Sequence, residues 1–192
     1  MINREKVKEL MHKLKDYSRE TYDHSIETAN IAVVIAQRFG YSEDELEMLF
    51  YASVLHDIGK TKIDKKILHS PNKLTDEEFA EMKKHTQYSY EMLEGFPEQM
   101  REIALHHHEK LNGNGYLGLK EDELSEFDKI LTVADITSAL HIKRSYKEAY
   151  SPEKIASILQ ENVDKGELVQ KYVDVAIQDY VFKKEENESE AF

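Results

Sequence analysis

The 192-residue sequence contains no cysteine, which excludes disulfides, zinc–thiolate sites and thiol nucleophiles. Only seven glycines and three prolines are present, so few positions end a helix or form a tight turn. There is no run of about 18 apolar residues that could span a membrane. Residues 1–6 lead into an amphipathic segment rather than an export signal. We therefore expect a cytoplasmic protein that is neither secreted nor bound to a membrane.

Basic residues are scarce relative to acidic ones. The 26 lysines and arginines against 38 aspartates and glutamates give a net charge of −12. Such a surface repels the phosphates of long nucleic acids, so we expect no DNA or RNA partner. A small anionic substrate remains compatible with this charge, because bound metal ions reverse the local field.

Apolar residues recur at helical spacings along most of the chain, and no window alternates as a strand does. Helices are predicted over residues 4–16, 18–38, 43–56, 76–93, 97–108, 126–143, 152–164 and 167–183. We expect an all-α fold, a compact single-domain helical bundle. Its parts would be an N-terminal helix (1–17), the main domain (18–183) and a charged tail (184–192) that we expect to be disordered.

Two aspartates are placed where burial is expected. Asp57 follows His56 directly after the apolar residues 52–55, and Asp135 lies within the apolar run 130–136. An unpaired buried carboxylate is costly, and a cation is the simplest compensation. For the His56-Asp57 pair taken alone, an ordinary polar helix end explains the pattern as well.

Three consecutive histidines follow the predicted helix that begins at Pro97. The apolar face that contains Ile103 continues into His107 and His108, whereas His106 lies about 200° from His108 at 100° per residue. If two of these histidines face inward, the helical register therefore favours His107 and His108.

Metal-competent side chains are spread over separate predicted helices. Glu20 and His24 share a helix face, although an ordinary ion pair explains this spacing too, and His85 alone would be a surface or core histidine. The set as a whole comprises His24, His56, Asp57, His85, His107, His108 and Asp135. Histidine and carboxylate without thiolate suit iron, manganese or another borderline divalent ion. Two ions bridged by an aspartate make water a nucleophile and stabilise charge on phosphorus.

The order of these motifs resembles the HD superfamily of metal-dependent phosphohydrolases, and within it the HD-GYP cyclic-di-GMP phosphodiesterases. The resemblance covers residues 20–180. The matching blocks are His56-Asp57-Ile58-Gly59-Lys60, Leu74-Thr75-Asp76-Glu77-Glu78, Met82-Lys83-Lys84-His85, His107-His108-Glu109, Gly113-Asn114-Gly115-Tyr116, Thr132-Val133-Ala134-Asp135 and Arg144-Ser145-Tyr146-Lys147. The sequence departs from the family pattern at Asn112, where aspartate is usual, at Leu117, where the motif has proline, and at Ser138, where a second aspartate is common.

The resemblance implies roles for individual residues. The seven residues would hold two divalent ions, iron or manganese, with Asp57 and Lys60 at the catalytic centre and Lys60 on the substrate phosphate. Glu20 would add a third ion. Substrate contacts would come from Arg144 and Lys147, which would hold guanine bases and phosphates, and from Tyr116 in the adjacent loop. Without the resemblance, Arg144 and Lys147 are explained as a solvated basic patch at a helix end.

These observations favour a phosphodiesterase that opens a cyclic dinucleotide, above all cyclic-di-GMP, to the linear dinucleotide or GMP. Two alternatives stay open: an HD phosphohydrolase that acts on another nucleotide, and a non-catalytic module that binds a nucleotide and signals to a partner. The sequence does not decide whether the protein forms a homodimer or which protein regulates it.

Overall fold

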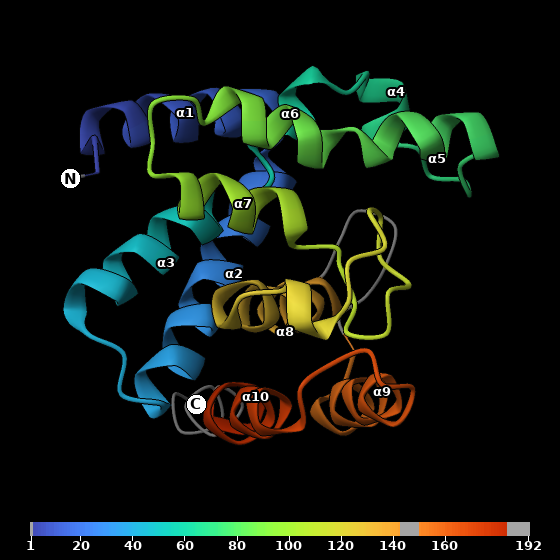
Figure 1. The fold of residues 1–192 in the computed structure, drawn as a ribbon. Coiled ribbons are helices and arrows are strands. Elements are labelled where there is room, and N and C mark those ends of the chain that lie inside the picture. The colour runs from blue at the N-terminus through green and yellow to red at the C-terminus, as the bar shows by residue number, and fades with distance from the viewer. Residues whose placement is uncertain (1, 143–149, 184–192) are drawn as a thin grey trace, which may run out of the picture.

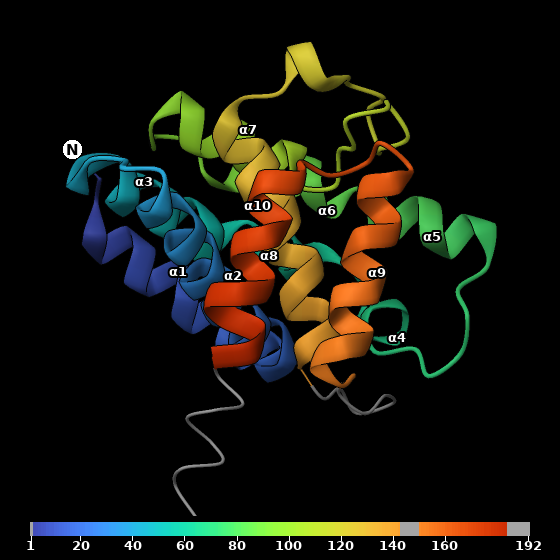
Figure 2. The ribbon, with the colours of Figure 1, turned by 90° about the horizontal axis from the view of Figure 1, so that it is seen from below.

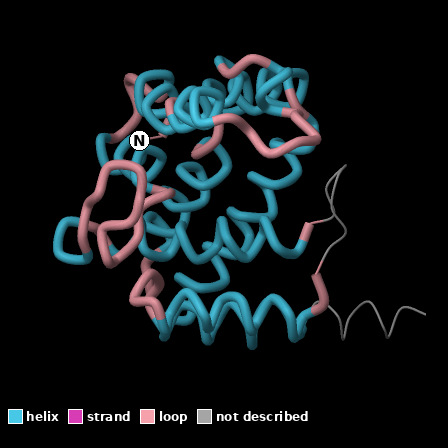
Figure 3. The backbone as a smooth tube through the Cα atoms, turned by 90° about the vertical axis from the view of Figure 1, so that its right-hand side faces the viewer, coloured by secondary structure: helices cyan, strands magenta, loops and turns pink. Residues whose placement is uncertain are grey.

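The computed structural model describes residues 2–142 and 150–183, in which helices are joined by loops and no strand is present (Figures 1 and 3). The helices of the first half are α1 (Arg4–Tyr17), α2 (Arg19–Arg38), α3 (Glu43–Leu55), η1 (Ile58–Lys62), α4 (Lys65–Leu68), α5 (Asp76–Lys83) and α6 (His85–Met92). The second half contains α7 (Glu98–His106), η2 (Glu121–Glu123), α8 (Glu126–His141), α9 (Pro152–Asp164), α10 (Gln170–Val175) and a π-helical turn, η3 (Ala176–Val181). The all-α prediction is confirmed.

Several helices begin at capping boxes, in which a Ser or Thr is followed three residues later by Glu or Asp. Ser42 accepts from the backbone of Glu45 while the Glu45 carboxylate accepts from the backbone of Ser42, and Thr75 with Glu78 repeats this arrangement at α5. Each side-chain cap satisfies backbone N–H groups that have no partner within the helix, at roughly 1 kcal/mol per cap. The starts of α3 and α5 are therefore fixed locally.

Helix α2 is the centre of the packing, in contact with α1, α3, α8, α10 and η3. Figure 1 shows α1 and α6 on one side of the layer that contains α2, α3, α7 and α8, with α9 and α10 on the other side. Figure 2 shows α9 and α10 beside α8. Leu14, Ile31, Leu49 and Met100 are fully buried where these layers meet, and each such side chain contributes about 1.5–3 kcal/mol. One core therefore includes the N-terminal helix α1.

Several predicted boundaries are wrong. The segment between the helices predicted over 43–56 and 76–93 contains η1 and α4, and the helix predicted over 167–183 begins at Gln170 and changes to a π-helical turn after Val175. The helix predicted over 97–108 ends at His106. The predicted helix over 76–93 is broken at Lys84 into α5 and α6. Helix α5 buries no residue, whereas α6 buries His85, so the break turns α6 toward the core independently of α5. Helix α8 ends at His141, before the predicted end at residue 143, and Ile142 is extended. The tail 184–192 lies outside the described residues.

Among the described helices, none combines the length and apolar character that a membrane span requires.

Candidate metal centre

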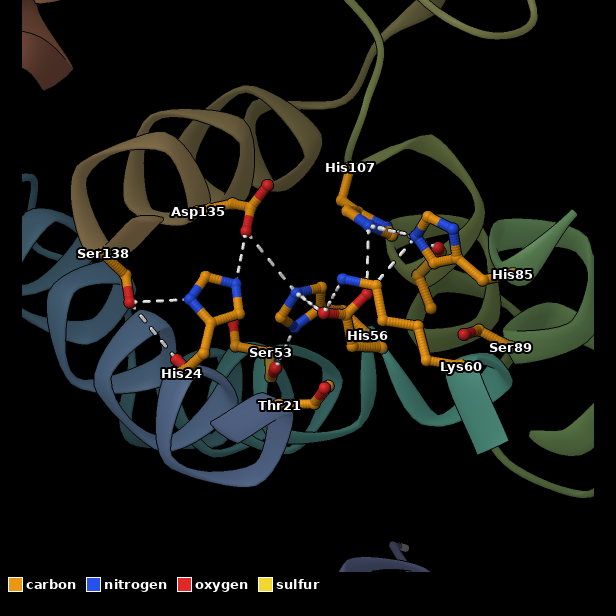
Figure 4. Close-up of polar contacts among 12 residues, drawn as sticks. Thr21, His24, Ser53, His56, Lys60, His85, Ser89, His107, Asp135 and Ser138 are labelled. Carbon is orange, nitrogen blue, oxygen red and sulfur yellow. Dashed lines mark hydrogen bonds and ion pairs between the residues drawn. The ribbon is translucent and has the colours of Figure 1, made fainter. Parts of the chain in front are cut away.

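Histidines and aspartates from five parts of the chain meet at one point in the core (Figure 4). His24 comes from α2, His56 and Asp57 follow α3, His85 begins α6, His107 and His108 follow α7, and Asp135 lies in α8. Their ligand atoms form three groups in which all atoms lie within 4.8 Å of one another, namely His24, His56 and Asp135; His56, Asp57 and His107; and His85, His107 and His108. All seven predicted side chains are thus brought together.

Three of the histidines are held by the same kind of hydrogen bond. Each donates its Nδ1–H to the carbonyl oxygen three residues earlier, in the last turn of the preceding helix. These bonds join His56 to Ser53 (2.6 Å), His85 to Met82 (2.7 Å) and His107 to Ala104 (2.8 Å). Because a carbonyl can only accept, Nδ1 carries the proton and the neutral ring has its lone pair on Nε2. Such fixed rings are typical of metal-binding histidines.

The freed nitrogens point at one another. The Nε2 atoms of His85 and His107 are 3.2 Å apart, and with both Nδ1 atoms protonated these are two facing lone pairs in the neutral rings. His56 Nε2 and Asp57 Oδ1 are buried and have no hydrogen-bond partner among the described residues. Unsatisfied buried groups of this kind are costly, and a shared cation would satisfy them. The donor set therefore fits divalent metal ions.

Asp57 lies between three histidines. Its Oδ1 is 3.3 Å from His85 Nε2 and 3.7 Å from His107 Nε2, and its Oδ2 is 3.5 Å from His56 Nε2. Lys60 Nζ lies 2.6 Å from the same Oδ2. Burial opposes ionisation, yet Lys60 and the histidines hold the pKa of Asp57 well below its usual range. Asp57 is therefore an anion that can face more than one cation.

Asp135 provides the second carboxylate. Its Oδ1 is 2.8 Å from His24 Nε2 and 3.6 Å from His56 Nε2. Burial opposes ionisation here too, but the hydrogen bond with His24 and the nearby His56 ring keep the pKa of Asp135 well below its usual range. Burial lowers the pKa of His56, and Asp57 together with Asp135 more than reverses this, so the net pKa is raised. His56 thus lies between two carboxylates, and this position favours a cation.

Burial keeps the other site histidines neutral. It lowers the pKa of His85 to about 3, with Lys60 adding to the effect, and it lowers the pKa of His108 to about 4. The pKa of His107 is also well below its ordinary value. At pH 7 these rings therefore present lone pairs, which is the form that a metal ion binds.

The His106–His108 segment departs from the helical register of the sequence. Helix α7 ends at His106, so His107 and His108 are directed by the turn that follows. His107 is buried, whereas the side chain of His108 is 27% exposed with Nδ1 3.7 Å from Asp135 Oδ2. His106 is half-buried, with its Nδ1 3.6 Å from Asp128 Oδ1. It belongs to none of the ligand groups.

A cavity of about 500 Å³ opens onto the cluster and is lined by Glu20, His24, Lys60, His85, His108 and Tyr116. Glu20 lies one turn before His24 on α2, as its spacing predicts. Residues 67–74, which include Lys73, also line the cavity. Arg144 and Lys147 lie outside the described residues.

The roles of two residues near the cluster were not predicted from the sequence. The Ser138 hydroxyl lies 2.9 Å from His24 Nδ1 and orients that ring. Its position three residues after Asp135, on the same helix face, was the available signal. Glu109 is buried and accepts hydrogen bonds from the backbone of the glycine-rich loop, residues 112–120. Nothing in the sequence distinguishes it from a surface glutamate, apart from its place after His107 and His108.

The sequence profile of the HD domain family matches residues 7–168, and the chain belongs to this family. The HD superfamily resemblance is thus confirmed. The chain is 39% identical over 161 residues to the 3′3′-cGAMP-specific phosphodiesterase 2 of Vibrio cholerae, which covers 79% of this chain and 31% of the relative. It is 36% identical over 136 residues to the cyclic di-GMP phosphodiesterase response regulator RpfG of Xanthomonas campestris, which covers 68% and 36%. The chain thus spans about a third of the length of these relatives.

Solved structures share the fold. Bd1817, an HDG"Y"P protein from Bdellovibrio bacteriovorus, superimposes with a TM-score of 0.69 at 19% identity, over 82% of this chain and 51% of that one. The HD domain of the L. monocytogenes phosphodiesterase PgpH, in complex with cyclic-di-AMP, gives a TM-score of 0.66 at 20% identity, over 91% and 94%. At this identity the likeness concerns the fold alone.

Proposed function

We propose that this protein is a metal-dependent phosphodiesterase that hydrolyses a cyclic dinucleotide, above all cyclic-di-GMP, to the linear dinucleotide or GMP. The observation that carries the proposal is the convergence of histidine Nε2 atoms on Asp57 and Asp135, beside an open cavity that His24, His85 and His108 line. The names of the relatives support the substrate class, and the 3′3′-cGAMP-specific relative makes the mixed cyclic dinucleotide the second candidate.

The residues of the cluster would hold two ions, iron or manganese. When bound, such ions activate a water at neutral pH and stabilise negative charge on phosphorus. Lys60 reaches the cavity and lies 2.6 Å from Asp57, so its ammonium can contact a substrate phosphate and offset the charge that develops there. Tyr116 would lie against the substrate from the other side. We assign Arg144 and Lys147 to base and phosphate contacts on the family motif alone.

The charge around the cavity favours an anionic substrate. Lys60 and Lys73 line it, and Lys62, Lys65 and Lys66 lie between these two in the sequence of a chain whose net charge is −12. A lysine-rich segment of an acidic protein therefore contributes two cations to the cavity wall. Local positive potential of this kind raises the concentration of anions at a site and speeds their association.

The direct test is hydrolysis. Protein purified without oxygen is incubated with cyclic-di-GMP, 3′3′-cGAMP, cyclic-di-AMP or a mononucleotide, each with iron(II), manganese(II), magnesium(II) or no metal, and linear products are separated by chromatography. We expect metal-dependent opening of a cyclic dinucleotide. Turnover of the mononucleotide alone would favour another phosphohydrolase. Tight nucleotide binding without turnover in any metal would favour the signalling module.

The two outer histidines of the His106–His108 segment should differ in their effect on metal content. His108→Ala removes a side chain of the ligand cluster and should lower the bound metal per chain, because His85 and His107 then lack their third neighbour. His106→Ala removes a ring that contacts Asp128 instead and should leave metal content as in the wild type. Elemental analysis of both variants decides. The reverse pattern would refute this assignment of ligands.

Glu20 is our candidate ligand for a third ion, since it lines the cavity one helical turn from His24. Glu20→Gln preserves its size and removes its charge. We expect three ions per chain to fall to two, with the other two retained, as measured by elemental analysis after loading with excess metal. A wild-type protein that binds only two ions, unchanged in the variant, would show that Glu20 makes an ordinary ionic contact.

A further inference from the structure

Glu109 is a buried carboxylate that belongs to none of the ligand groups described above. Both of its oxygens accept hydrogen bonds from backbone amides of the loop that follows. Oε1 accepts from Leu117 at 2.7 Å, and Oε2 accepts from Leu119 at 2.8 Å. Charge-assisted bonds to backbone N–H groups are among the stronger hydrogen bonds in proteins. One side chain thus holds two points of the loop.

The loop also passes directly over Glu109. A Cβ at Gly115 would lie 2.5 Å from Glu109 Cα and 2.7 Å from its Oε2, so only glycine allows this approach. A bridge between Asn112 and Lys120 closes the base of the loop. The segment from residue 112 to residue 120 is therefore pinned at its base by backbone pairing and at its centre by Glu109.

Tyr116 lies between Gly115, which packs against Glu109, and Leu117, whose amide donates to Glu109. Its ring centroid is 4.6 Å from that of His108 and 6.3 Å from that of His85, and the ring lines the cavity. On the outer side, Lys83 Nζ lies 5.4 Å from the centroid of the Tyr116 ring. The ring thus forms a wall beside the metal-facing histidines, while the next residue in the chain, Leu117, is hydrogen-bonded to Glu109.

We propose that Glu109 is a positioning residue: it fixes the loop so that Tyr116 forms a rigid aromatic wall for a nucleobase of the substrate. The substrate part rests on the proposed function. A base that stacks on an aromatic ring needs the ring at a defined distance and angle, and Glu109 supplies this through the amides of Leu117 and Leu119. It takes no part in the chemical step.

The first experiment replaces the carboxylate by its amide. Glu109→Gln keeps one acceptor oxygen and turns an NH₂ toward the other amide, so one of the two loop bonds is lost. Hydrogen exchange measured by NMR should become at least about tenfold faster at Leu117 or Leu119. The Michaelis constant for the cyclic dinucleotide should rise about tenfold, with kcat reduced less than about threefold and metal content as in the wild type. These factors correspond to loss of a single such hydrogen bond.

The matched control is Glu123→Gln. Glu123 also accepts from a backbone amide of this region, that of Lys120 at 3.1 Å, but it is exposed. Exchange at Leu117 and Leu119 and the Michaelis constant should match the wild type. If Glu109→Gln behaves like this control, the proposal is wrong. A rise in the Michaelis constant with unchanged exchange at both leucines would also refute it.

A second variant and a reporter cover the case in which Glu109→Gln does not fold. Gly115→Ala leaves the carboxylate in place and forces the loop away from it, so hydrogen exchange at Leu117 and Leu119 should again become faster.

The sequence has no tryptophan, so Tyr116→Trp places a single indole in the cavity wall. Acrylamide should quench its fluorescence more strongly when Gly115→Ala is added, and equal quenching would refute the proposal. Neither readout needs turnover, so absence of cyclic dinucleotide hydrolysis would overturn the proposed function and leave the role of Glu109 in the loop to these measurements.

Discussion

Asp57→Asn should remove most of the bound metal and lower hydrolysis at least about a hundredfold. The carboxylate faces three histidine Nε2 atoms and the Lys60 ammonium within 3.7 Å. An amide of the same size cannot balance their charge or that of the ions. Loss of several kcal/mol of charge stabilisation corresponds to a rate reduction of this size or more. Elemental analysis and the initial rate on the preferred cyclic dinucleotide measure the two effects.

The matched control for this prediction is Asp128→Asn. Asp128 is also buried, but it accepts from Ser125 at the start of α8 and lies outside the ligand groups. This variant should lose some stability and keep its metal. Wild-type metal content and activity in Asp57→Asn would exclude Asp57 from the metal centre.

Gly59→Ala should be the most destabilising single methyl addition in the described chain, at more than about 3 kcal/mol in the free energy of unfolding. A Cβ at this position would lie 2.0 Å from the carbonyl oxygen of His85 and 2.5 Å from the amide nitrogen of Ser89. Both are backbone atoms, so α6 as a whole must move. Overpacking that side chains can relieve costs about 1–3 kcal/mol, and here no side chain can yield. Denaturant unfolding and metal content measure the result.

Gly166→Ala is the control for added methyl groups. No atom lies within 4 Å of its Cβ position, and its φ of +69° imposes only the strain of a left-handed residue, about 1–2 kcal/mol. It should keep its metal, whereas Gly59→Ala should lose metal because His85 moves with α6. Equal stability of the two variants would show that the η1–α6 contact adapts easily.

The sequence predicts those parts of the fold that short-range chemistry determines. Ser42 and Thr75 fix two helix starts through capping boxes, and Gly166 ends α9, as their residue types require. The break at Lys84 could not be predicted, because no glycine or proline marks it. It depends on the packing of α6 against Gly59, which is distant in sequence.

In the candidate site, too, some features can be predicted from the sequence and others depend on the folded structure. Asp57 and Asp135 are recognisable because a carboxylate in an apolar run needs a cation, and the structure places both at the cluster. The orientation of the rings is not readable, because it depends on backbone carbonyls at helix ends. Ser138 and Glu109 act through contacts that exist only after folding.

The hydrogen bonds of His56, His85 and His107 have a thermodynamic consequence. Each ring donates to a carbonyl in the last turn of α3, α5 or α7, where carbonyls lack the hydrogen bond that a helix interior supplies. Folding itself therefore restricts the rotamers of these three side chains, whether or not an ion is bound. Fixing a side chain otherwise costs roughly 0.5–1.5 kcal/mol at the moment of binding. An ion that enters this centre meets ligands that have already lost that entropy, and its affinity is higher by the same amount.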